Sequence, residues 1–499
     1  MVLSPWRTAA GLACLAAGTY YFNFFIETVD GSGVYLSATY SRADLLIATA
    51  VLWFVSLLAC RGALSILAAA SGVLRTVGFA VYSGMMLAVA LRCYMKVAGY
   101  LLTDEVLRFD WIAQGGPQRW LLATPAVLTT LFLLNSPLRS ASLLRFLGVC
   151  GVVAVPLGVW RMLQTPIGFT GPPLVQAQAV ITTTTPAPRR VIWLVLDEFD
   201  PEVAFHQALG VAADMPNLQK VRASGVVMTR AASPAGSTDL SLPAMLMGKT
   251  VRSLIYDGPG RATLVDTDGQ RTPFDTAHSV FGQLPSGPAS ASMLGFYHPY
   301  CKVFALGACT SIGTNMGTQW FDGLANLVPK RITGVLDPMT RISERQVAIW
   351  PGLLADASKT LTVLHLNLPH LPSHYAEAQT GVKATSSTDA YRINLIYTDR
   401  VVGEIRQALE SAPSSQQQLL IISSDHWWRA RGVRTPHPAL LMVKLRHDST
   451  PLVIDNPVSS YHLAGLTLAF LRGELDSHGD IRQWYLKQPY VPTWIPNAD

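Results

Sequence analysis

Charged residues are scarce in this sequence. Asp, Glu, Lys and Arg make up 14% of its 499 residues, half of the residues are hydrophobic, and the mean hydropathy is +0.29. These values are high for a protein that is soluble throughout, so they indicate a membrane portion. The apolar excess lies in the first 165 residues, whereas the remainder has the composition of a globular domain.

Blocks of Lys or Arg are absent as well. The net charge of +6 is mild for this length and no basic helix stands out, so nucleic acid is not an expected partner. A chain of 499 residues without internal repeats predicts two or three ordinary units.

Cysteine is also rare, with six residues in the chain. Four of them lie in or beside apolar segments, where a free cysteine behaves as a small hydrophobic residue. Cys301 and Cys309 are the two that fall outside those segments. This pair suggests a disulfide formed in an oxidising compartment. Two unpaired thiols are the alternative, and the spacing does not exclude it.

Five apolar segments occupy the first third of the chain, each near the length that crosses a bilayer core. No small-residue cleavage site follows the first of them, so it is predicted to be a span rather than a signal peptide. The five segments are Thr8–Phe25, Leu45–Cys60, Val73–Leu91, Trp120–Asn135 and Leu143–Trp160.

Basic residues orient these spans. Five spans put the two chain ends on opposite faces, and the positive-inside tendency favours a cytoplasmic amino terminus, with the carboxyl-terminal domain outside the cytoplasm. Arg92, Lys96, Arg108 and Arg119 oppose this orientation because they would lie outside. The arginines that support it are Arg7, Arg61, Arg75, Arg139 and Arg145.

The chain is predicted to have three parts. They are a five-helix transmembrane domain over residues 1–163, a Pro- and Thr-rich linker over 164–189, and an α/β domain over 190–499. In the last part, strands alternate with helices, which predicts a mostly parallel sheet flanked by helices. The expected elements include strands at Val191–Leu196, Thr362–Leu366 and Leu419–Ile422, a helix over Asp389–Leu409, and a helix followed by a strand between Ser279 and Cys301.

Candidate metal ligands follow two of these strands. Asp197 and Glu198 follow Val191–Leu196, and Asp425 and His426 follow the later strand. Ligands bind outside the carboxyl ends of strands in open α/β sheets, where these groups would supply three or four ligands for Zn or Mn. Each pair has an ordinary alternative, namely a solvated acidic turn for the first and a turn with a hydrogen-bonded histidine for the second.

Thr238 lies at the expected start of a helix, in AGSTDLSLPAML. Backbone N–H groups and the helix dipole favour an anion at that position. A threonine hydroxyl becomes a nucleophile only when a base or a metal activates it. An ordinary N-cap made by Ser237, Thr238 or Ser241 is the simpler interpretation of this motif in isolation.

Two histidines and one aromatic segment are further candidates. His370 in NLPHLP and His437 in RTPHPALL lie beside predicted strands and would contact a substrate phosphate or a second metal; a histidine satisfied within its loop is the alternative for either. The segment Ser311–Leu327, which includes Trp320, would cover the mouth of the site, although core packing explains its aromatic residues equally well.

Together these motifs resemble the alkaline phosphatase/sulfatase superfamily over residues 190–440. The shared pattern is a strand ending in Asp197-Glu198, then Pro216-Asn217-Leu218, then Thr238 ten residues ahead of Gly248, and later Ser424-Asp425-His426, with the helix IYTDRVVGEI (Ile396 to Ile405) ahead of the last strand. True sulfatases carry Cys or Ser followed by x-P-x-R at the nucleophile. This chain has Thr238 followed by DLSLP, which argues against formylglycine chemistry.

Five spans ahead of such a domain resemble the membrane phosphoethanolamine transferases and the phosphoglycerol transferase group that includes lipoteichoic acid synthase. The resemblance implies a multi-pass protein of a bacterial inner membrane, with its catalytic domain in the periplasm or outside. It also implies a divalent metal, Zn or else Mn. The resemblance implies that Thr238 is the nucleophile and that His370 and His437 contact the phosphate. The implied metal ligands are Glu198, Asp425 and His426, together with Asp197 and the Thr238 hydroxyl.

The chain departs from this group in two places. The cysteines that bracket the nucleophile in many phosphoethanolamine transferases are absent, and Trp427-Trp428-Arg429 replaces the usual glycine and acidic residue. Donor or acceptor can therefore differ from those of the best-known members, and Arg429 and Trp320 are candidate substrate contacts.

Three hypotheses of function follow. The first is a transferase that moves a phospholipid head group, phosphoethanolamine or else phosphoglycerol, onto an extracytoplasmic glycan or glycolipid through a phospho-threonine intermediate. The second is a membrane-anchored phosphodiesterase or sulfatase-type hydrolase, for which five spans are more than an anchor needs. The third is a scaffold that keeps the fold without turnover.

Overall fold

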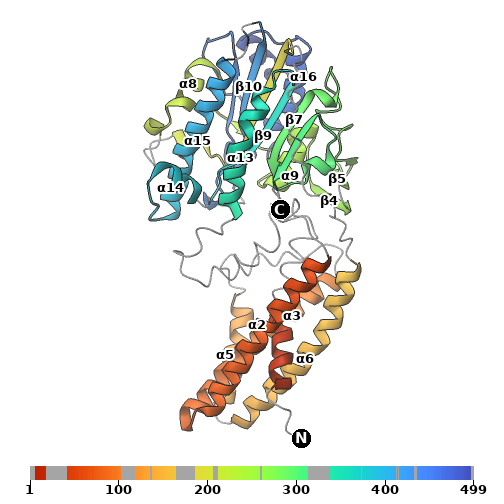
Figure 1. Cartoon of the computed structure of the whole chain (residues 1–499), viewed down its shortest axis with the longest axis vertical. Helices are drawn as coiled ribbons and strands as arrows, with labels where there is room; N and C mark the ends of the chain where they lie inside the picture. The colour runs from red at the N-terminus through yellow and green to blue at the C-terminus, as the bar shows by residue number, and fades with distance from the viewer. Residues whose placement is uncertain are drawn as a thin grey trace. The chain divides into compact units, whose positions relative to one another are not determined.

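The computed structural model describes residues 6–17, 42–102, 119–134, 137–164, 186–205, 212–258, 261–312, 338–371, 374–411, 413, 415–431 and 435–495. The chain divides into two compact units (Figure 1). The described residues of the first unit lie between 6 and 164, and those of the second between 186 and 495. Most of the predicted linker, residues 165–185, lies outside the described residues.

The first unit consists of helices. One of its helices overlaps each of the five apolar segments expected from the sequence. Within the described residues, Ala50–Ala69 and Gly72–Leu91 are long and apolar enough to cross a membrane, so a five-span topology stays a prediction. The helices are residues 6–17, α2 (Arg42–Ala69), α3 (Gly72–Leu102), α5 (Arg119–Leu133) and α6 (Pro137–Gln164).

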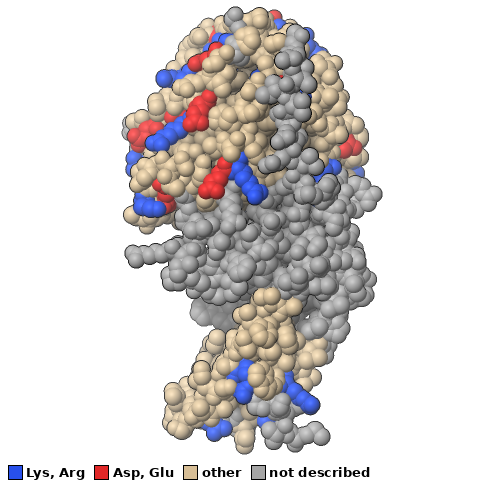
Figure 2. Space-filling model, in the orientation of Figure 1, with Lys and Arg blue, Asp and Glu red and all other residues tan. Residues whose placement is uncertain are grey.

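The outer surface of these helices is apolar. Large side chains such as Ile66, Val73 and Phe132 are more than half exposed, as expected for residues that face lipid. On the face seen in Figure 2, the described part of this unit shows basic but no acidic side chains.

Three glycines let two helices of this unit cross closely. A Cβ atom at Gly11, in helix 6–17, would lie 2.0 Å from the carbonyl oxygen of Gly148 in α6. A Cβ atom at Gly151 would lie 2.0 Å from the carbonyl oxygen of Gly11. Small residues at such crossings bring helix backbones into direct contact, which is a common mode of packing inside membranes.

The second unit is built on an eight-stranded sheet with the order β12-β2-β11-β10-β1-β9-β7-β8. Strand β11 is antiparallel to both of its neighbours, and the other pairs are parallel, so the predicted mostly parallel sheet is confirmed. The strands are β1 (Arg189–Asp197), β2 (Val226–Met228), β7 (Ala291–Phe296), β8 (Ala308–Ile312), β9 (Leu361–Pro369), β10 (Gln417–Ser424), β11 (Leu441–Leu445) and β12 (Leu452–Ile454).

Two small sheets complete the strands of this unit. One pairs β3 (Ala231–Ala232) with β13 (Val458–Ser459), and the other contains β4 (Ser253–Gly258), β5 (Arg261–Val265) and β6 (Arg271–Pro273). Short 3-10 helices occur at Ala212–Asp214, Pro288–Ser290, Arg429–Arg431 and Ser460–His462.

Helices cover both faces of the large sheet, as predicted. One face packs against α9 (Thr238–Met247), α10 (Tyr300–Val303), α16 (Leu463–Leu471) and α17 (His478–Leu486). The other packs against α7 (Pro201–Phe205), α8 (Pro216–Ser224), α13 (Pro338–Ala355), α14 (His374–Thr380) and α15 (Ser387–Glu410). The unit therefore has three layers, with an apolar core on each side of the sheet.

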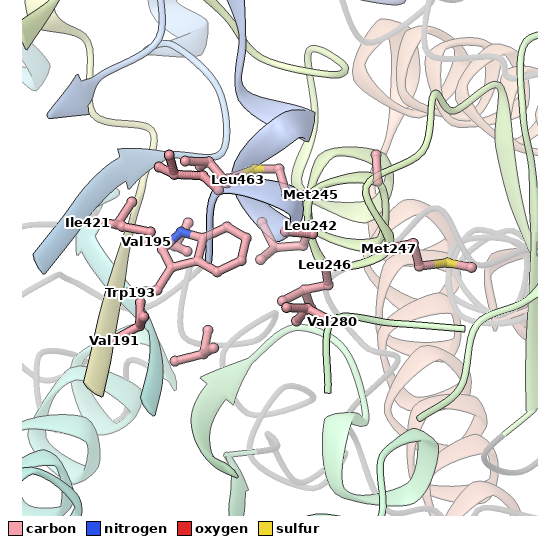
Figure 3. Close-up of a cluster of buried hydrophobic side chains, with 14 of the residues drawn as sticks. Val191, Trp193, Val195, Leu242, Met245, Leu246, Met247, Val280, Ile421 and Leu463 are labelled. Atoms are coloured by element: carbon pink, nitrogen blue, oxygen red, sulfur yellow. The ribbon is translucent and has the colours of Figure 1, made fainter. Parts of the chain in front are cut away.

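Alternate side chains of β1 belong to the apolar cores on opposite faces of the sheet. Trp193 and its odd-numbered neighbours belong to the core on the α9 side, whereas Ile192, Leu194 and Leu196 belong to the other. Figure 3 shows the Trp193 ring beside Leu242 and Leu246 of α9. The indole N–H donates to Ser423 Oγ of β10 at 3.0 Å, so this large buried ring also satisfies its polar atom. These contacts position α9 against the sheet.

The helix predicted from Ser279 onward is wrong, because residues 276–283 form turns. The Asp275 carboxylate accepts a hydrogen bond from the His278 backbone N–H at 3.0 Å, and Ser279 Oγ donates to the Thr276 carbonyl at 2.9 Å. Local side-chain bonds of this kind compete with the helical pattern. The strand expected after it is present as β7.

Candidate active site

The carboxyl ends of two neighbouring strands and the start of one helix meet at the candidate site. Strand β1 ends at Asp197, and β10 ends at Ser424, one residue before Asp425. The two strands are parallel, and Leu196 pairs with Ser424. The residues that follow each strand therefore lie at the same edge of the sheet, where Thr238 is the first residue of α9.

The Thr238 hydroxyl lies at the centre of this site. Its Oγ1 donates to Asp425 Oδ2 at 2.6 Å, lies 3.2 Å from His426 Nε2, and lies 3.4 Å from Asp197 Oδ1. All four side chains are buried. Asp197, Asp425 and His426 also form a group whose possible ligand atoms lie within 4.8 Å of one another. The structure thus brings together the nucleophile candidate and three of the predicted metal ligands.

The ordinary N-cap interpretation of this motif does not hold. Ser237 is the N-cap residue, but its side chain makes no capping hydrogen bond. Ser241 Oγ instead bonds the backbone of Ala235, at 3.1 Å from the nitrogen and 2.8 Å from the oxygen. Thr238 points its hydroxyl at Asp425 rather than at a helix N–H, so capping does not explain it.

The donor set fits a divalent cation. Asp197 Oδ1 and Asp425 Oδ2 both lie near the Thr238 hydroxyl, which has one proton to donate, so one carboxylate oxygen is left without it. Burial, then the charges of Asp425 and Glu198, raise the pKa of Asp197 well above its usual range. A cation would relieve that repulsion, and two carboxylates, an imidazole nitrogen and a hydroxyl are ligands that suit Zn or Mn.

Asp425 has the opposite bias. Burial pushes its pKa upward, but the imidazoles of His426 and His365 and the bond from Thr238 hold the pKa of Asp425 below its ordinary value. Asp425 Oδ1 also accepts hydrogen bonds from the backbone N–H groups of Glu198 at 3.0 Å and His426 at 2.8 Å. Asp425 is therefore held as a carboxylate in a fixed orientation.

His426 presents the nitrogen that a metal requires. Its Nδ1 lies 2.8 Å from the carbonyl oxygen of Trp427, which can only accept, so Nδ1 carries the proton. Nε2 is then the lone-pair nitrogen, and it lies 3.4 Å from Asp425 Oδ2. A backbone carbonyl that fixes the tautomer in this way is typical of metal-ligating histidines.

Glu198 departs from its predicted place among the ligands. Its carboxylate bonds the guanidinium of Arg429, and it is not one of the three residues that converge within 4.8 Å. The physical reason lies in the backbone: Glu198 has a φ of 62°, so the chain turns sharply after Asp197 and the two carboxylates meet different partners.

Tyr391 holds this strained turn. Its hydroxyl donates to the Glu198 carbonyl at 2.6 Å and accepts from the Asp200 N–H at 3.0 Å. Trp428 stacks on the Tyr391 ring with centroids 4.3 Å apart. The other tryptophan of the pair, Trp427, packs against Gly236, where an added Cβ would lie 3.1 Å from its ring. Both tryptophans thus have structural roles beside the site.

The predicted phosphate-contacting histidines differ in position. His370 Nε2 lies 2.8 Å from an Arg429 nitrogen and 3.7 Å from Glu198 Oε1, at one side of the site. His437 instead lies 3.5 Å from Glu202 Oε2, with its ring 6.0 Å from that of Trp427. Because α7 supplies Glu202 as its partner, the structure does not bring His437 against Thr238.

Trp320 lies outside the described residues. Cys301 and Cys309 are joined by a disulfide, which links α10 to β8.

The sequence motifs did not point to two buried histidines, His298 and His365. His298 follows β7, and its Nε2 lies 3.3 Å from the Thr238 carbonyl. His365 lies within β9 and bonds the Tyr300 hydroxyl through Nδ1 at 3.0 Å. Burial lowers the pKa of His298 to about 3 and that of His365 to about 4, so both are neutral. The rule applied to Asp197, that residues after a parallel strand lie at the ligand edge, would have predicted His298; no sequence signal distinguishes His365.

The P-N-L part of the motif has a structural role. Asp399 of α15 accepts hydrogen bonds from the backbone N–H of Asn217 at 3.2 Å and of Leu218 at 2.7 Å, at the start of α8. It also accepts one from the Asn217 side chain at 3.0 Å. Gly403, one turn further along α15, leaves room for that side chain, since a Cβ there would lie 2.6 Å from it. This part of the motif joins two helices and takes no part in the site.

No model of a protein family matches this sequence. No curated protein matches it either.

Several solved structures are similar to the chain. One is the integral membrane lipooligosaccharide phosphoethanolamine transferase A of Neisseria meningitidis, which is 13% identical, with a TM-score of 0.37 over 92% of this chain and 95% of that chain. Another is the periplasmic domain of a phosphoethanolamine transferase from Campylobacter jejuni, 14% identical, with a TM-score of 0.35 over 57% and 89%. A sulfatase from Pseudoalteromonas is 14% identical, with a TM-score of 0.38 over 59% and 69%.

These structures include the transferase group and the sulfatases that the sequence motifs resemble. The identities and TM-scores are low, so what the site does is inferred from the residues of this chain.

Proposed function

We propose that this chain is a metal-dependent phosphotransferase of the alkaline phosphatase superfamily. It would move a phospholipid head group, phosphoethanolamine or else phosphoglycerol, onto an extracytoplasmic glycan or glycolipid through a phospho-threonine intermediate. The observation that carries this proposal is the Thr238 hydroxyl, 2.6 Å from Asp425 and 3.2 Å from His426 at the first turn of a helix. An alcohol in that setting is arranged to act as a nucleophile.

Asp197, Asp425 and His426 would hold the cation together with the Thr238 hydroxyl. When bound, the cation lowers the pKa of that hydroxyl and screens the charge of the donor phosphate. The Thr238 hydroxyl already donates its proton in a hydrogen bond to Asp425 Oδ2. Backbone N–H groups at the start of α9 favour the negative charge of the phosphate.

The reaction would proceed in two displacements. Thr238 Oγ1 forms a bond to phosphorus, the bond from phosphorus to the diacylglycerol oxygen breaks, and diacylglycerol leaves with a proton. The acceptor hydroxyl then attacks the same phosphorus, loses its proton, and releases Thr238. A lipid donor accounts for the membrane unit, and the chain is proposed to lie in a bacterial inner membrane, with its catalytic unit in the periplasm or outside.

Intact-mass analysis tests the proposal. The purified chain in detergent is mixed with phosphatidylethanolamine or phosphatidylglycerol in the presence of Zn, and each covalent adduct is mapped by peptide mass. An adduct on Thr238, absent from Thr238→Ala and absent after treatment with a chelator, supports the transferase. The mass of the adduct identifies the donor.

A second measurement, the release of free head group with and without an added acceptor, separates a transferase from a hydrolase. A hydrolase releases free head group at the same rate with or without a glycan acceptor, whereas a transferase turns over only when an acceptor is added. A chain that binds no metal and forms no adduct would be a scaffold, which overturns the proposal.

A further inference from the structure

Arg429 occupies one side of the candidate site and contacts two residues there. Its Nε donates to Glu198 Oε1, and a terminal nitrogen lies 2.8 Å from His370 Nε2. The Arg429 side chain is 42% exposed, whereas that of Glu198 is 5% exposed. The guanidinium thus lies between the buried site and solvent.

These contacts use the lone pair of His370 Nε2 and engage one oxygen of Glu198, both of which a second cation would need. A guanidinium has donors only, so His370 Nε2 must accept the bond from Arg429. The other ring nitrogen of His370 then carries its proton and donates to the Leu371 carbonyl. The Glu198 carboxylate is likewise bonded to Arg429. Both groups are turned toward a positive charge that is fixed, because arginine does not lose its proton in proteins.

The remaining donors of Arg429 suit a phosphate. Five N–H groups belong to a guanidinium, and the bonds to Glu198 and His370 use two of them. The planar group matches two phosphate oxygens at once, which makes arginine a strong phosphate ligand. Burial opposes the charge, but Glu198 and Asp197 outweigh it and raise the pKa of Arg429 further, so the charge is permanent.

We propose that Arg429 replaces a second metal ion: the site takes one divalent cation, and the guanidinium binds the phosphate of the donor head group. This inference rests on the proposed function and adds to it the source of the second positive charge. It also assigns a role to Arg429, which belongs to the Trp427-Trp428-Arg429 segment that replaces the usual glycine and acidic residue of the transferase group. Glu198 and His370 then position Arg429 rather than bind metal.

The number of cations per chain tests the first half. The full-length chain in detergent is saturated with Zn, desalted, and measured by native mass spectrometry with elemental analysis. The wild-type chain and Arg429→Lys should hold one cation, and Arg429→Glu should hold two, because Glu198, His370 and the new carboxylate are then free to bind one. Arg400→Glu, on the exposed face of α15, makes the same charge change away from the site and should hold one.

Two cations in the wild-type chain would overturn the inference while leaving the proposed function intact. One cation in both the wild-type chain and Arg429→Glu would overturn it too, because Arg429 would not be what excludes the second ion. No bound cation in the wild-type chain would overturn the proposed function itself, so the two failures are distinguishable.

Binding of inorganic phosphate tests the second half. Titration calorimetry is carried out on the Mn-loaded full-length chain. Arg429→Gln should bind phosphate at least about tenfold more weakly than the wild-type chain, because a charge-assisted hydrogen bond is lost. Arg400→Gln should bind as the wild-type chain does. Equal affinity in Arg429→Gln and the wild-type chain would show that Arg429 does not contact the phosphate.

Discussion

Replacing Tyr391 by Phe tests how the site is held in shape. The hydroxyl of this fully buried residue donates to the Glu198 carbonyl at 2.6 Å and accepts from the Asp200 N–H at 3.0 Å. Phe keeps the ring and its stacking on Trp428 but leaves two buried backbone groups without a partner. Each such group costs about 1–3 kcal/mol, so the loss of both partners should lower the free energy of unfolding by roughly 2–6 kcal/mol.

Thermal melting of the full-length chain in detergent measures this loss. A change of that size corresponds to a fall in Tm of roughly 3–9 °C for a unit of this length. Tyr485→Phe is the matched control, because Tyr485 is also buried, at 2% exposure, and its hydroxyl has no hydrogen-bond partner among the described residues. That variant should melt at or above the wild-type temperature.

The comparison also reports on the site. Glu198 is held with a φ of 62° and donates its N–H to Asp425 Oδ1 at 3.0 Å. Loss of the Tyr391 hydroxyl should therefore lower activity as well as stability, whereas Tyr485→Phe should leave activity unchanged. If the two variants melt at the same temperature, the Tyr391 bonds contribute nothing to stability and this reasoning is refuted.

Three further predictions concern other parts of the chain. Asp399→Ala should lower the free energy of unfolding by about 2–3 kcal/mol in urea titrations, because the start of α8 loses its buried acceptor. A loss below about 0.5 kcal/mol, the usual size for a surface substitution, would contradict this prediction. Gly11→Leu should lower Tm, whereas Gly62→Leu should not, since a Cβ at Gly11 meets backbone at 2.0 Å and one at Gly62 meets nothing within 4 Å. Burial lowers the pKa of His478 in the folded chain. The contribution of neutral His478 to stability is therefore present above the unfolded pKa, about 6.5, and is lost as the pH falls through that value toward the folded pKa. The free energy of unfolding of His478→Gln, measured against pH, should lack this decrease.

Much of the central sheet could be predicted from sequence. Val191–Leu196 and Leu419–Ile422 are short apolar runs bounded by polar residues, and both are buried strands, β1 and β10. The edge that carries Asp197, Asp425 and His426 follows from the rule for parallel strands. That rule needs no tertiary information, because the direction of a strand decides which residues come after it.

Other parts depend on contacts that a local pattern does not contain. The three residues of β2 and the antiparallel β11 gain their structure from pairing with each other, across more than two hundred residues of chain. The turn at Asp275 defeats a helical pattern through side-chain bonds. Whether Glu198 turns toward a cation or toward Arg429 is decided by its backbone conformation, which the neighbouring identities Asp197 and Phe199 do not specify.

The hydrogen bonds of Asp399 show that the sequence motif contains two sets of residues, one that joins helices and one that forms the candidate site. Asn217, Leu218 and Gly403 form the contact between α8 and α15, whereas Thr238, Asp425 and His426 form the candidate active site. Replacement of Thr238 would remove none of the hydrogen bonds that Asp399 makes to α8. The P-N-L segment and the T-D-R helix therefore indicate the fold, whereas the proposed catalysis depends on the Thr238 hydroxyl and its neighbours at the strand ends.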